Sequence, residues 1–545
     1  MPTATRARLG GITYEHPAGF WAGVTAVTAG VLLHLPMYVR ARHMHYRLAG
    51  MGMDGAMAAG MVLIATGLVA TFYGLYPAKA DALHARASRL RVRPLDDAPI
   101  RPVHIGLLVV MAVAVTIDVM KPTSLSFVVP GFAKEYGLKS PANPHGHPAA
   151  ALLPLFGIGG TVIGSFLWGW LADRVGRRAS ILLAGVVFVA TSICGSMPSY
   201  KLNLAMCFVM GLGAGGMLPI TFALLAETIP ARHRGWLMVL IGGDVAGAYV
   251  ITSWLSSSLV PHYTWRILWL VGLPTGLLLL VLNRWIPESP RFLLAAGRDD
   301  EAAAVMGRYG AAVVPDEDPD VAVEERVAGR FDQLLRPPFL TLTGVIMLLG
   351  IGVGLVAYGF QLWIPSNLQK LGYTQVTADR ILRDSALIGF PLNFVVAWLY
   401  GFWSSRRTIV LLTSLTAAAL VGFAVAGDRV ATHTTLLHVL LVVPIWGISS
   451  VLAVLVAYSS EVYPTRIRAR GTGLAAGASK AGGVLLIALG VAAVAPLSIT
   501  GTAIMGAVPM ALAAVAVAVF GVETRRRRLE EITADELGRT AAAAG

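Results

Sequence analysis

Charged side chains are scarce in this chain of 545 residues. Asp, Glu, Lys and Arg together make up 13% of it, whereas a soluble domain carries about 25%. With 56% hydrophobic residues, this scarcity excludes a soluble enzyme and a disordered scaffold, and it predicts a protein that faces lipid. Cysteine is rarer still. Cys194 and Cys207 both lie in apolar runs and are too few for a zinc ligand set or a disulfide framework.

Long apolar runs fill most of the chain. A spanning helix needs about 20 predominantly apolar residues. Runs of that length predict fourteen membrane helices, near 18–38, 55–76, 103–130, 152–172, 179–198, 202–226, 236–259, 266–285, 338–364, 381–403, 408–427, 436–459, 472–494 and 499–522. The first run begins too late and is too long for a cleaved signal peptide, so we expect the N-terminus to stay attached.

Basic residues outnumber acidic ones, 43 to 30, and most of them cluster at helix ends. Such clusters are retained on the cytoplasmic side, so the positive charge indicates topology. Binding to nucleic acid is therefore not needed to explain it, and we expect no nucleic-acid partner. The pattern predicts a multi-pass plasma-membrane protein with both termini in the cytoplasm. Arg40, Arg42 and Arg47 fall outside in this topology, which makes the first two helices its weakest part.

The chain contains an internal repeat. Glu227, Pro230 and Arg234 recur with the same spacing at Glu461, Pro464 and Arg468, 234 residues later. Duplication of a six-helix unit suits a transporter with its site between the two halves. The predicted organisation is a two-helix segment with a basic linker (1–102), a six-helix half (103–286), a cytoplasmic loop (287–337), a second half (338–522) and a cytoplasmic tail (523–545).

A glycine-rich and charged motif joins the second and third core helices. Its residues are Gly169, Asp173, Arg174, Gly176, Arg177 and Arg178. The two glycines permit a close turn, Asp173 suits a helix N-terminus, and the arginines can pair with Glu227 in a latch that breaks when this side opens. An ordinary basic loop explains the arginines but not the full spacing.

This motif resembles the loop between helices two and three of the major facilitator superfamily. Three other stretches resemble its sugar-porter and organic-acid:proton symporter branches: Pro287–Arg291, the Glu461 to Gly471 motif, and Glu523–Arg525 with the Leu529–Glu531 segment. The resemblance covers roughly 103–535. It implies an all-α membrane protein with twelve core helices in two pseudo-symmetric halves, working by alternating access and commonly driven by protons. The first two helices have no counterpart in the twelve-helix family.

Two departures from the family pattern stand out. Phe402 occupies the place of the motif's Asp in the second half, and Cys207 occupies the place of an arginine that many members carry in helix four. The Cys207 departure therefore weakens the transfer of a proton relay that uses that arginine.

Charges inside apolar spans are costly and mark function. Asp118 and Lys121 lie three residues apart on one face of the first core helix. The family's acid symporters often have an Asp in this helix, which supports Asp118 as the proton acceptor. Lys121 would attract an anionic substrate or hold Asp118 ionised. The alternative is a permanent ion pair that only lines the cavity.

A second pair of charges occupies equivalent places in the two halves. Asp244 and Lys480 are 236 residues apart, the same displacement as between Gly235 and Gly471. We expect the two charges to meet when the cytoplasmic side closes, although each could instead be satisfied within its own half.

Substrate contacts are predicted from polar and aromatic residues at membrane depth. Aromatic faces and amide hydrogen bonds are offered by Tyr358, Gln361 and Trp363 in the seventh core helix (338–364) and by Asn393 in the eighth (381–403). Residues of these types also pack between helices. The histidines and methionines of the first two helices have no metal-site spacing, so we expect no metal and no cofactor. We expect a packing or assembly role for that segment.

The sequence thus predicts a secondary transporter that carries a small organic acid or sugar-like metabolite with protons. Its partners are the solute, protons and the lipid bilayer, and we expect a monomer. Efflux by proton antiport is an alternative, because these motifs do not encode direction. A transport-inactive nutrient sensor is another. We predict no enzyme, because the chain has no recognisable nucleophile–base set or metal cluster.

Overall fold

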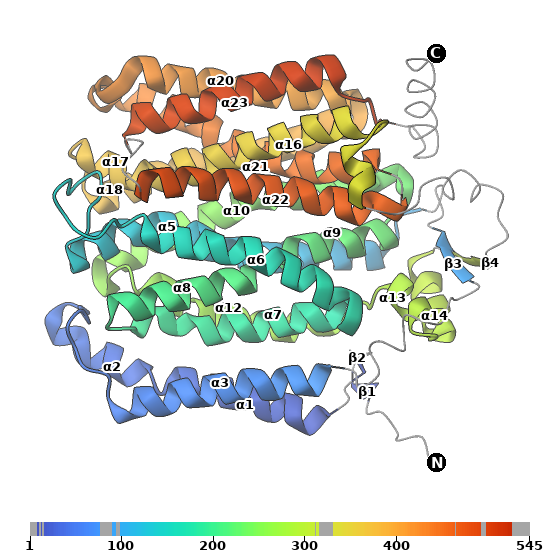
Figure 1. Ribbon diagram of the computed structural model, residues 1–545, viewed down its shortest axis with the longest axis horizontal. Coiled ribbons are helices and arrows are strands. Elements are labelled where there is room, and N and C mark those ends of the chain that lie inside the picture. Colours follow the sequence, from blue (N-terminus) through green and yellow to red (C-terminus); the bar gives the residue numbers. More distant parts are fainter. Residues whose placement is uncertain are drawn as a thin grey trace. The chain divides into compact units, whose positions relative to one another are not determined.

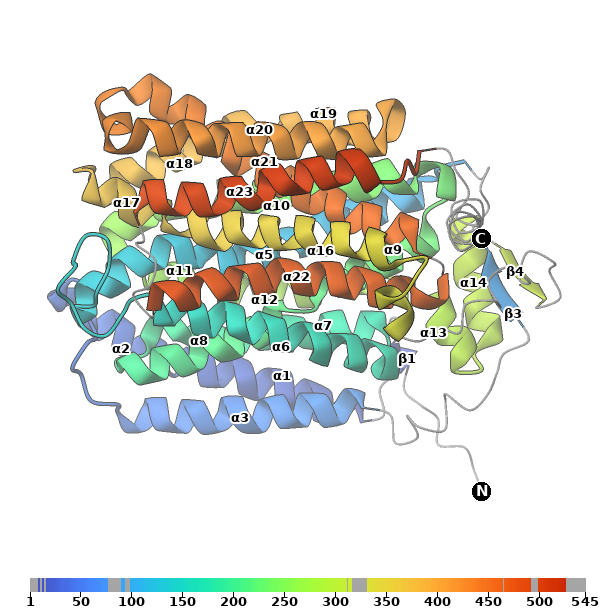
Figure 2. The same cartoon turned by 45° about the horizontal axis from the view of Figure 1, so that its top comes forward.

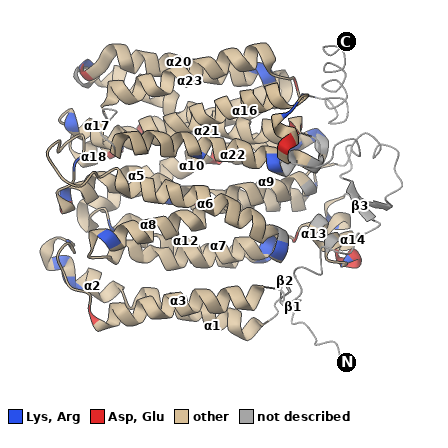
Figure 3. Ribbon diagram, viewed as in Figure 1, with Lys and Arg blue, Asp and Glu red and all other residues tan. Residues whose placement is uncertain are grey.

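A computed structural model of the chain describes residues 16–76, 99–310, 331–463, 465–491 and 498–525, together with four short strand segments (Figure 1). Within these residues, fourteen helical stretches are long and apolar enough to cross a bilayer, which confirms the predicted number. Helices are the physical solution here, because a backbone in lipid must satisfy its own hydrogen bonds. Charged residues gather near the helix ends, and the spans are mostly uncharged (Figure 3).

The described residues form two compact units. As far as its segments are described, the first unit comprises Met1–Gly137, Phe156–Ala231 and Ser258–Asp316. The second comprises Leu138–Leu155, Arg232–Ser257 and Glu317–Gly545. These units differ from the predicted halves mainly in one helix, whose larger part groups with the second unit.

The first unit contains the two leading helices and most helices of the first predicted half. Its helices are α1 (Pro17–Leu32), α2 (Leu35–Arg40), α3 (Gly55–Leu75), α5 (Pro102–Tyr136), α6 (Leu152–Val175), α7 (Arg177–Thr191), α8 (Tyr200–Ala214), α9 (Met217–Thr228), α11 (Ile267–Leu270), α12 (Gly272–Leu282), α13 (Pro290–Ala295) and α14 (Asp299–Tyr309). The helix α10 (Ala231–Tyr263) begins and ends in this unit.

Glycines bring α1 and α3 into backbone contact. A methyl group on Gly23 would lie 2.6 Å from the Gly67 carbonyl oxygen, and one on Gly30 would lie 2.6 Å from the Gly60 oxygen. Small residues at such positions let membrane helices approach closely. The pair packs along α7 through a core that includes Val27, Ile64 and Val189 (Figure 1). The leading helices therefore belong to the body of the first unit.

Small antiparallel sheets lie outside the spans. Strands β1 (Arg8–Leu9) and β2 (Ile12–Thr13) form one, and β3 (Leu90–Arg93) and β4 (Ala312–Pro315) form the other. The second sheet joins the predicted basic linker to the predicted central loop, a pairing that the sequence analysis did not anticipate.

The second unit is built from the remaining spans. Its helices are α16 (Leu340–Gly354), α17 (Ile364–Lys370), α18 (Gln375–Gly389), α19 (Leu392–Trp398), α20 (Ser405–Ala426), α21 (Thr434–Val462), α22 (Thr465–Val491) and α23 (Ile499–Phe520). The helices α20 and α23 lie side by side (Figure 2), and α16 packs on α22. The larger part of α10 joins this unit because it contacts α18 and α19, where Gly247 meets Phe390 and Gly243 meets Asn393.

Candidate functional site

A break in a membrane helix marks the candidate site. After Gly354, the span Leu340–Lys370 passes through a π-helical segment, Leu355–Phe360, and a 3₁₀ turn, Gln361–Trp363, before α17 begins. Such segments inside helices are frequent at functional sites, because they redirect side chains and free backbone groups. The predicted substrate residues Tyr358, Gln361 and Trp363 all lie in this irregular stretch. Tyr358 packs against Gly483 of α22.

A buried carboxyl group that sequence reasoning missed lies in the same unit. Asp379 on α18 is 1% exposed, and its Oδ2 accepts a 2.6 Å hydrogen bond from Ser256 Oγ on α10. The Tyr249 side chain lies beside Gln361 and within electrostatic range of Asp379. Helices α10 and α18 and the irregular stretch thus direct polar groups toward one another.

The sequence did carry a signal for Asp379. The predicted span began at residue 381 and left Asp379 in a loop, whereas the helical span begins at Gln375. Buried positions of α18 recur with helical spacing at Ala378, Leu382 and Ser385, and Asp379 lies on that face. A periodicity test applied to this polar turn would have placed the carboxyl inside.

Several buried polar atoms of the second unit have no hydrogen-bond partner among the described residues. They include Asp379 Oδ1, Trp363 Nε1, Ser366 Oγ, Ser385 Oγ and Trp446 Nε1. Buried polar groups are nearly always hydrogen-bonded in folded proteins, so a set of such atoms is typical of a site that a ligand or water completes. Most of them can donate hydrogen bonds, which suits a substrate with acceptor oxygens.

Asn393 is engaged by the protein itself. Its Nδ2 donates to the Phe390 carbonyl oxygen at 3.0 Å, and its Oδ1 accepts from Ser450 Oγ at 2.9 Å. These bonds join α19 to α21 beside Gly243 and favour a packing role for this predicted substrate residue.

Asp118 and Lys121 are both buried in α5, at 3% and 5% exposure. The Lys121 ammonium donates to the Phe188 carbonyl oxygen of α7 at 3.4 Å and lies 5.7 Å from the Phe188 ring centre. It also occupies the space that a side chain on Gly272 of α12 would fill. Lys121 is therefore directed at α7 and α12 within the first unit.

Asp244 and Lys480 lie within the α10 and α22 spans, where both are half-buried. Their meeting stays a prediction.

The predicted turn of the charged motif forms at one of its two glycines. Gly176 has a φ of 99°, a conformation that favours glycine, and it ends α6 just before α7. Gly169 lies inside α6, as the predicted span 152–172 has it, with open space around it. Arg174 stacks on the Trp170 ring at 4.1 Å. The side chains of Asp173, Glu227 and Arg468 lie outside the described part, so the expected latch with Glu227 stays a prediction.

Glu288 caps the helix that follows this turn. Its carboxylate accepts hydrogen bonds from the backbone N–H groups of Arg177 at 2.8 Å and Arg178 at 3.3 Å, and Arg178 Nε reaches Asn283. An anion is stabilised at this position because the first N–H groups of a helix lack partners within it. Burial raises the pKa of Glu288, although the backbone N–H groups of Ser289, Arg178 and Arg177 act against it.

Glu523 caps the beginning of α20 in the second unit. It accepts from the Ser405 backbone N–H at 2.9 Å and from Ser405 Oγ at 2.6 Å. Burial alone would raise the pKa of Glu523, but hydrogen bonds from Ser404 and Ser405 lower it below its ordinary value. The two capping glutamates thus occupy equivalent positions, but their pKa values are shifted in opposite directions.

The structure brings Arg234 and Glu461 together from different copies of the repeated motif. The Glu461 carboxylate accepts from Tyr400 Oη at 2.6 Å and Thr524 Oγ1 at 2.7 Å, with the Arg234 charge in electrostatic range. A side chain at Gly235 would collide with this carboxylate. The close contact explains why a glycine follows Arg234.

Comparison with known proteins identifies this architecture. The family model described as "Sugar (and other) transporter" matches residues 128–535. The chain belongs to this transporter family. It is 27% identical over 403 residues to the niacin transporter NiaP of Acinetobacter baylyi, covering 72% of this chain and 88% of NiaP. It is 26% identical over 406 residues to the 4-hydroxybenzoate transporter PcaK of the same species, with coverages of 72% and 85%.

Among solved structures, the fold is similar to the proton:xylose symporter XylE of E. coli, a major facilitator superfamily protein. The TM-score is 0.64 at 17% identity, and the match covers 79% of this chain and 99% of XylE. The chain is therefore a multi-pass transporter of the major facilitator superfamily and not an enzyme, with a twelve-helix core and two additional N-terminal helices.

Proposed function

We propose that this transporter moves a small organic acid across the plasma membrane together with protons, by alternating access to one central site. It works as a monomer with both termini in the cytoplasm. The names of its relatives support an aromatic carboxylate as the substrate class, since niacin and 4-hydroxybenzoate are both aromatic acids.

The Asp379 carboxyl in α18 is the observation that carries this proposal. An ionised carboxylate is costly in a buried position, and protonation removes that cost. With one oxygen bonded to Ser256 and the other without a partner among the described residues, Asp379 has room to take up a proton. Asp118 in α5 is a second proton acceptor, and Lys121 supplies a positive charge that favours an anionic substrate.

Buried donors at the helix break and on α21 complete the proposed substrate site. Trp363 Nε1, Ser366 Oγ and Trp446 Nε1 would donate hydrogen bonds to carboxylate oxygens. The indole and phenol rings of this region would stack on an aromatic ring. The 3₁₀ turn at Gln361–Trp363 lets these groups change direction as the helix flexes between the two access states.

Proteoliposomes with an internal pH dye test the proton role. We expect niacin or 4-hydroxybenzoate to acidify the interior in the wild type, and Asp379→Asn and Asp118→Asn to lose this signal. The matched control is Asp384→Asn on the same helix, because the Asp384 side chain is 46% exposed and pairs with Arg383 at its surface. This control should transport normally.

Counterflow of labelled substrate separates coupling from folding. A proton carrier that is replaced by Asn should keep counterflow, which needs no proton gradient, while it loses uphill accumulation. Uphill, pH-dependent accumulation by both Asn variants would refute the proton role. Substrate-driven alkalinisation of the interior would indicate antiport instead.

Asp244 and Lys480 supply a further element of the proposed cycle. We propose that they attract each other when the side nearest to Gly235 and Gly471 closes. Reversing either charge should then abolish transport, and reversing both should restore it. Failure of the double variant to recover any transport would count against the pair.

A further inference from the structure

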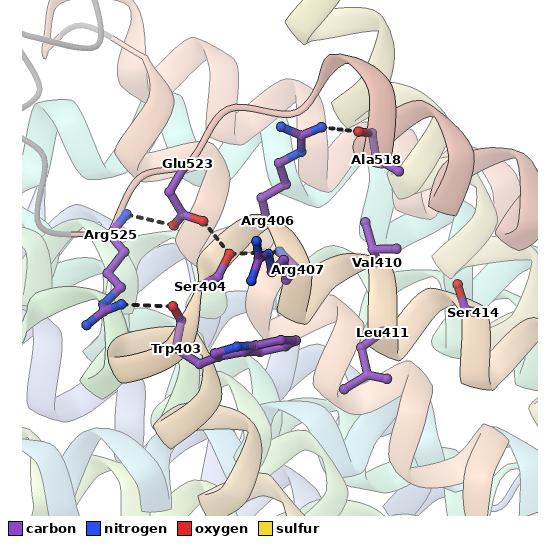
Figure 4. Close-up of a pocket in the computed structure, with 10 residues that line it drawn as sticks. All are labelled: Trp403, Ser404, Arg406, Arg407, Val410, Leu411, Ser414, Ala518, Glu523 and Arg525. Atoms are coloured by element: carbon purple, nitrogen blue, oxygen red, sulfur yellow. Dashed lines mark hydrogen bonds between the residues drawn. The ribbon is translucent and has the colours of Figure 1, made fainter.

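A groove runs between the beginning of α20 and the end of α23. It encloses about 1000 Å³, and Figure 4 shows the side chains that line it. Three arginines, Arg406, Arg407 and Arg525, line one part, and Val410 and Leu411 line another. The proposed transport mechanism uses none of these residues.

The arginine end of the groove is positively charged. Glu523 is the acidic residue among its lining residues, and the carboxylate is already bonded to Ser404, Ser405 and the Arg525 backbone. Arg406 is held against the Ala518 carbonyl, and Arg525 donates to the Trp403 carbonyl at 2.9 Å (Figure 4). Three guanidinium groups against one carboxylate leave the groove with a net positive charge.

Two of these arginines keep donors available. Arg407 is exposed, and no hydrogen bond or ion pair of its guanidinium is found with the described residues. Arg525 Nε is buried without a partner among them. Guanidinium donors in this state match the oxygens of a phosphate, which they bind in a fork geometry.

The rest of the groove is directed along the membrane-spanning helix. Arg406 and Ser414 are eight residues apart on α20, so the lining extends about 12 Å at 1.5 Å per residue. Leu411 within the α20 span is 38% exposed, and Trp403 at the charged end is 40% exposed. Tryptophan is enriched where a span meets the headgroup layer, and exposed apolar residues within a span face acyl chains.

We propose that this groove binds one anionic phospholipid. The phosphate lies among Arg406, Arg407 and Arg525. The part of one acyl chain nearest to the headgroup lies along Val410, Leu411 and Ala518. A free phosphate would use the arginine end alone and leave the apolar length empty, whereas a phospholipid fills both. Basic pockets between membrane helices are known to hold anionic headgroups. The bound lipid would tie α20 to α23 where Glu523 caps α20.

Thermal unfolding of the delipidated, detergent-solubilised transporter tests this proposal. Phosphatidylglycerol or cardiolipin should raise the melting temperature, because a ligand that binds only the folded state stabilises it. Phosphatidylcholine and inorganic phosphate should not. Native mass spectrometry should find the anionic lipid retained in preference to phosphatidylcholine.

Variants locate the site. Arg407→Gln should weaken the apparent affinity for the anionic lipid about fivefold, the contribution of one basic residue near an anionic surface, and Arg407→Lys should keep most of it. The matched control is Arg284→Gln, because Arg284 stacks on exposed Trp285 at the end of another span, outside this groove. An equal effect of phosphatidylcholine, an Arg407→Gln variant with unchanged affinity, or an equal loss in Arg284→Gln would overturn the proposal.

Discussion

Replacing Glu135 with glutamine perturbs a buried carboxylate at the end of α5. Glu135 Oε1 accepts from the backbone N–H groups of Leu48 and Ala49 at 2.9 and 3.0 Å and from Arg266 at 2.8 Å. Its Oε2 accepts from Trp265 Nε1 at 2.9 Å and from Arg266 Nε at 3.2 Å. One side chain therefore holds the loop between α2 and α3 to the body of the first unit.

The expected cost is large because both charges are buried. The side chains of Arg266 and Glu135 are 0% and 5% exposed, and Arg266 also donates to the Met197 carbonyl at 2.8 Å. Removing one partner of such a pair costs about 3–5 kcal/mol, since the other charge stays buried without compensation. At about 2 °C per kcal/mol for a large domain, Glu135→Gln should lower the melting temperature by roughly 6–10 °C.

Thermal unfolding in detergent measures this effect, and hydrogen exchange localises it. The Leu48 and Ala49 amides should exchange faster in the variant, because an amide oxygen is a weaker acceptor than a carboxylate. The matched control is Glu301→Gln, whose pair with Arg298 is partly exposed, at 30% and 19%, and should cost less than about 1 kcal/mol. A melting shift in Glu135→Gln no larger than in this control would refute the reasoning.

Two further predictions concern packing and pH. Gly354→Ala should cost about 1–3 kcal/mol, because the new methyl group would collide with the backbone of α22 at Ser479 and Gly483, which cannot rotate away. Gly344→Ala on the same helix has open space around it and should cost little, and thermal unfolding compares the two variants. The folded-state pKa of Glu288 is raised, so the wild type loses stability as pH rises from 4.5 through that pKa. The melting temperature of Glu288→Gln, measured relative to that of the wild type, should therefore rise over this pH range. The folded-state pKa of Glu523 is lowered, so the stability that its cap contributes is lost as pH falls below 4.5. The melting temperature of Glu523→Gln, measured relative to that of the wild type, should therefore rise as pH falls. The same sign of pH dependence in both variants would contradict the assigned pKa directions.

Hydropathy predicted the fourteen spans because the bilayer imposes length and apolarity on each helix independently of its neighbours. The same local logic identified Asp118 and Lys121, which interrupt a long apolar run. It missed Asp379, since the first turn of α18 is polar and only its helical periodicity shows which face is buried.

Contacts between distant parts of the chain were beyond this reasoning. Glu135 and Arg266 both lie near predicted span ends, where charges are ordinary, and nothing local indicates that they pair across 131 residues. Glu288 and Glu523 belong to motifs that a family resemblance highlights. Their capping of α7 and α20 depends on how each unit folds back on itself, which hydropathy does not describe.

The glycine contacts between α1 and α3 have a consequence for the order of assembly. Gly23, Gly30, Gly60 and Gly67 are complete as an interface once two helices are in the membrane, before any core helix has been made. Glu135, which fastens the loop of this hairpin, is synthesised 60 residues after α3 ends at Leu75. A growing chain can thus pack α1 against α3 first. Glu135 at the end of the third span then binds the loop of this hairpin and attaches it to the rest of the first unit.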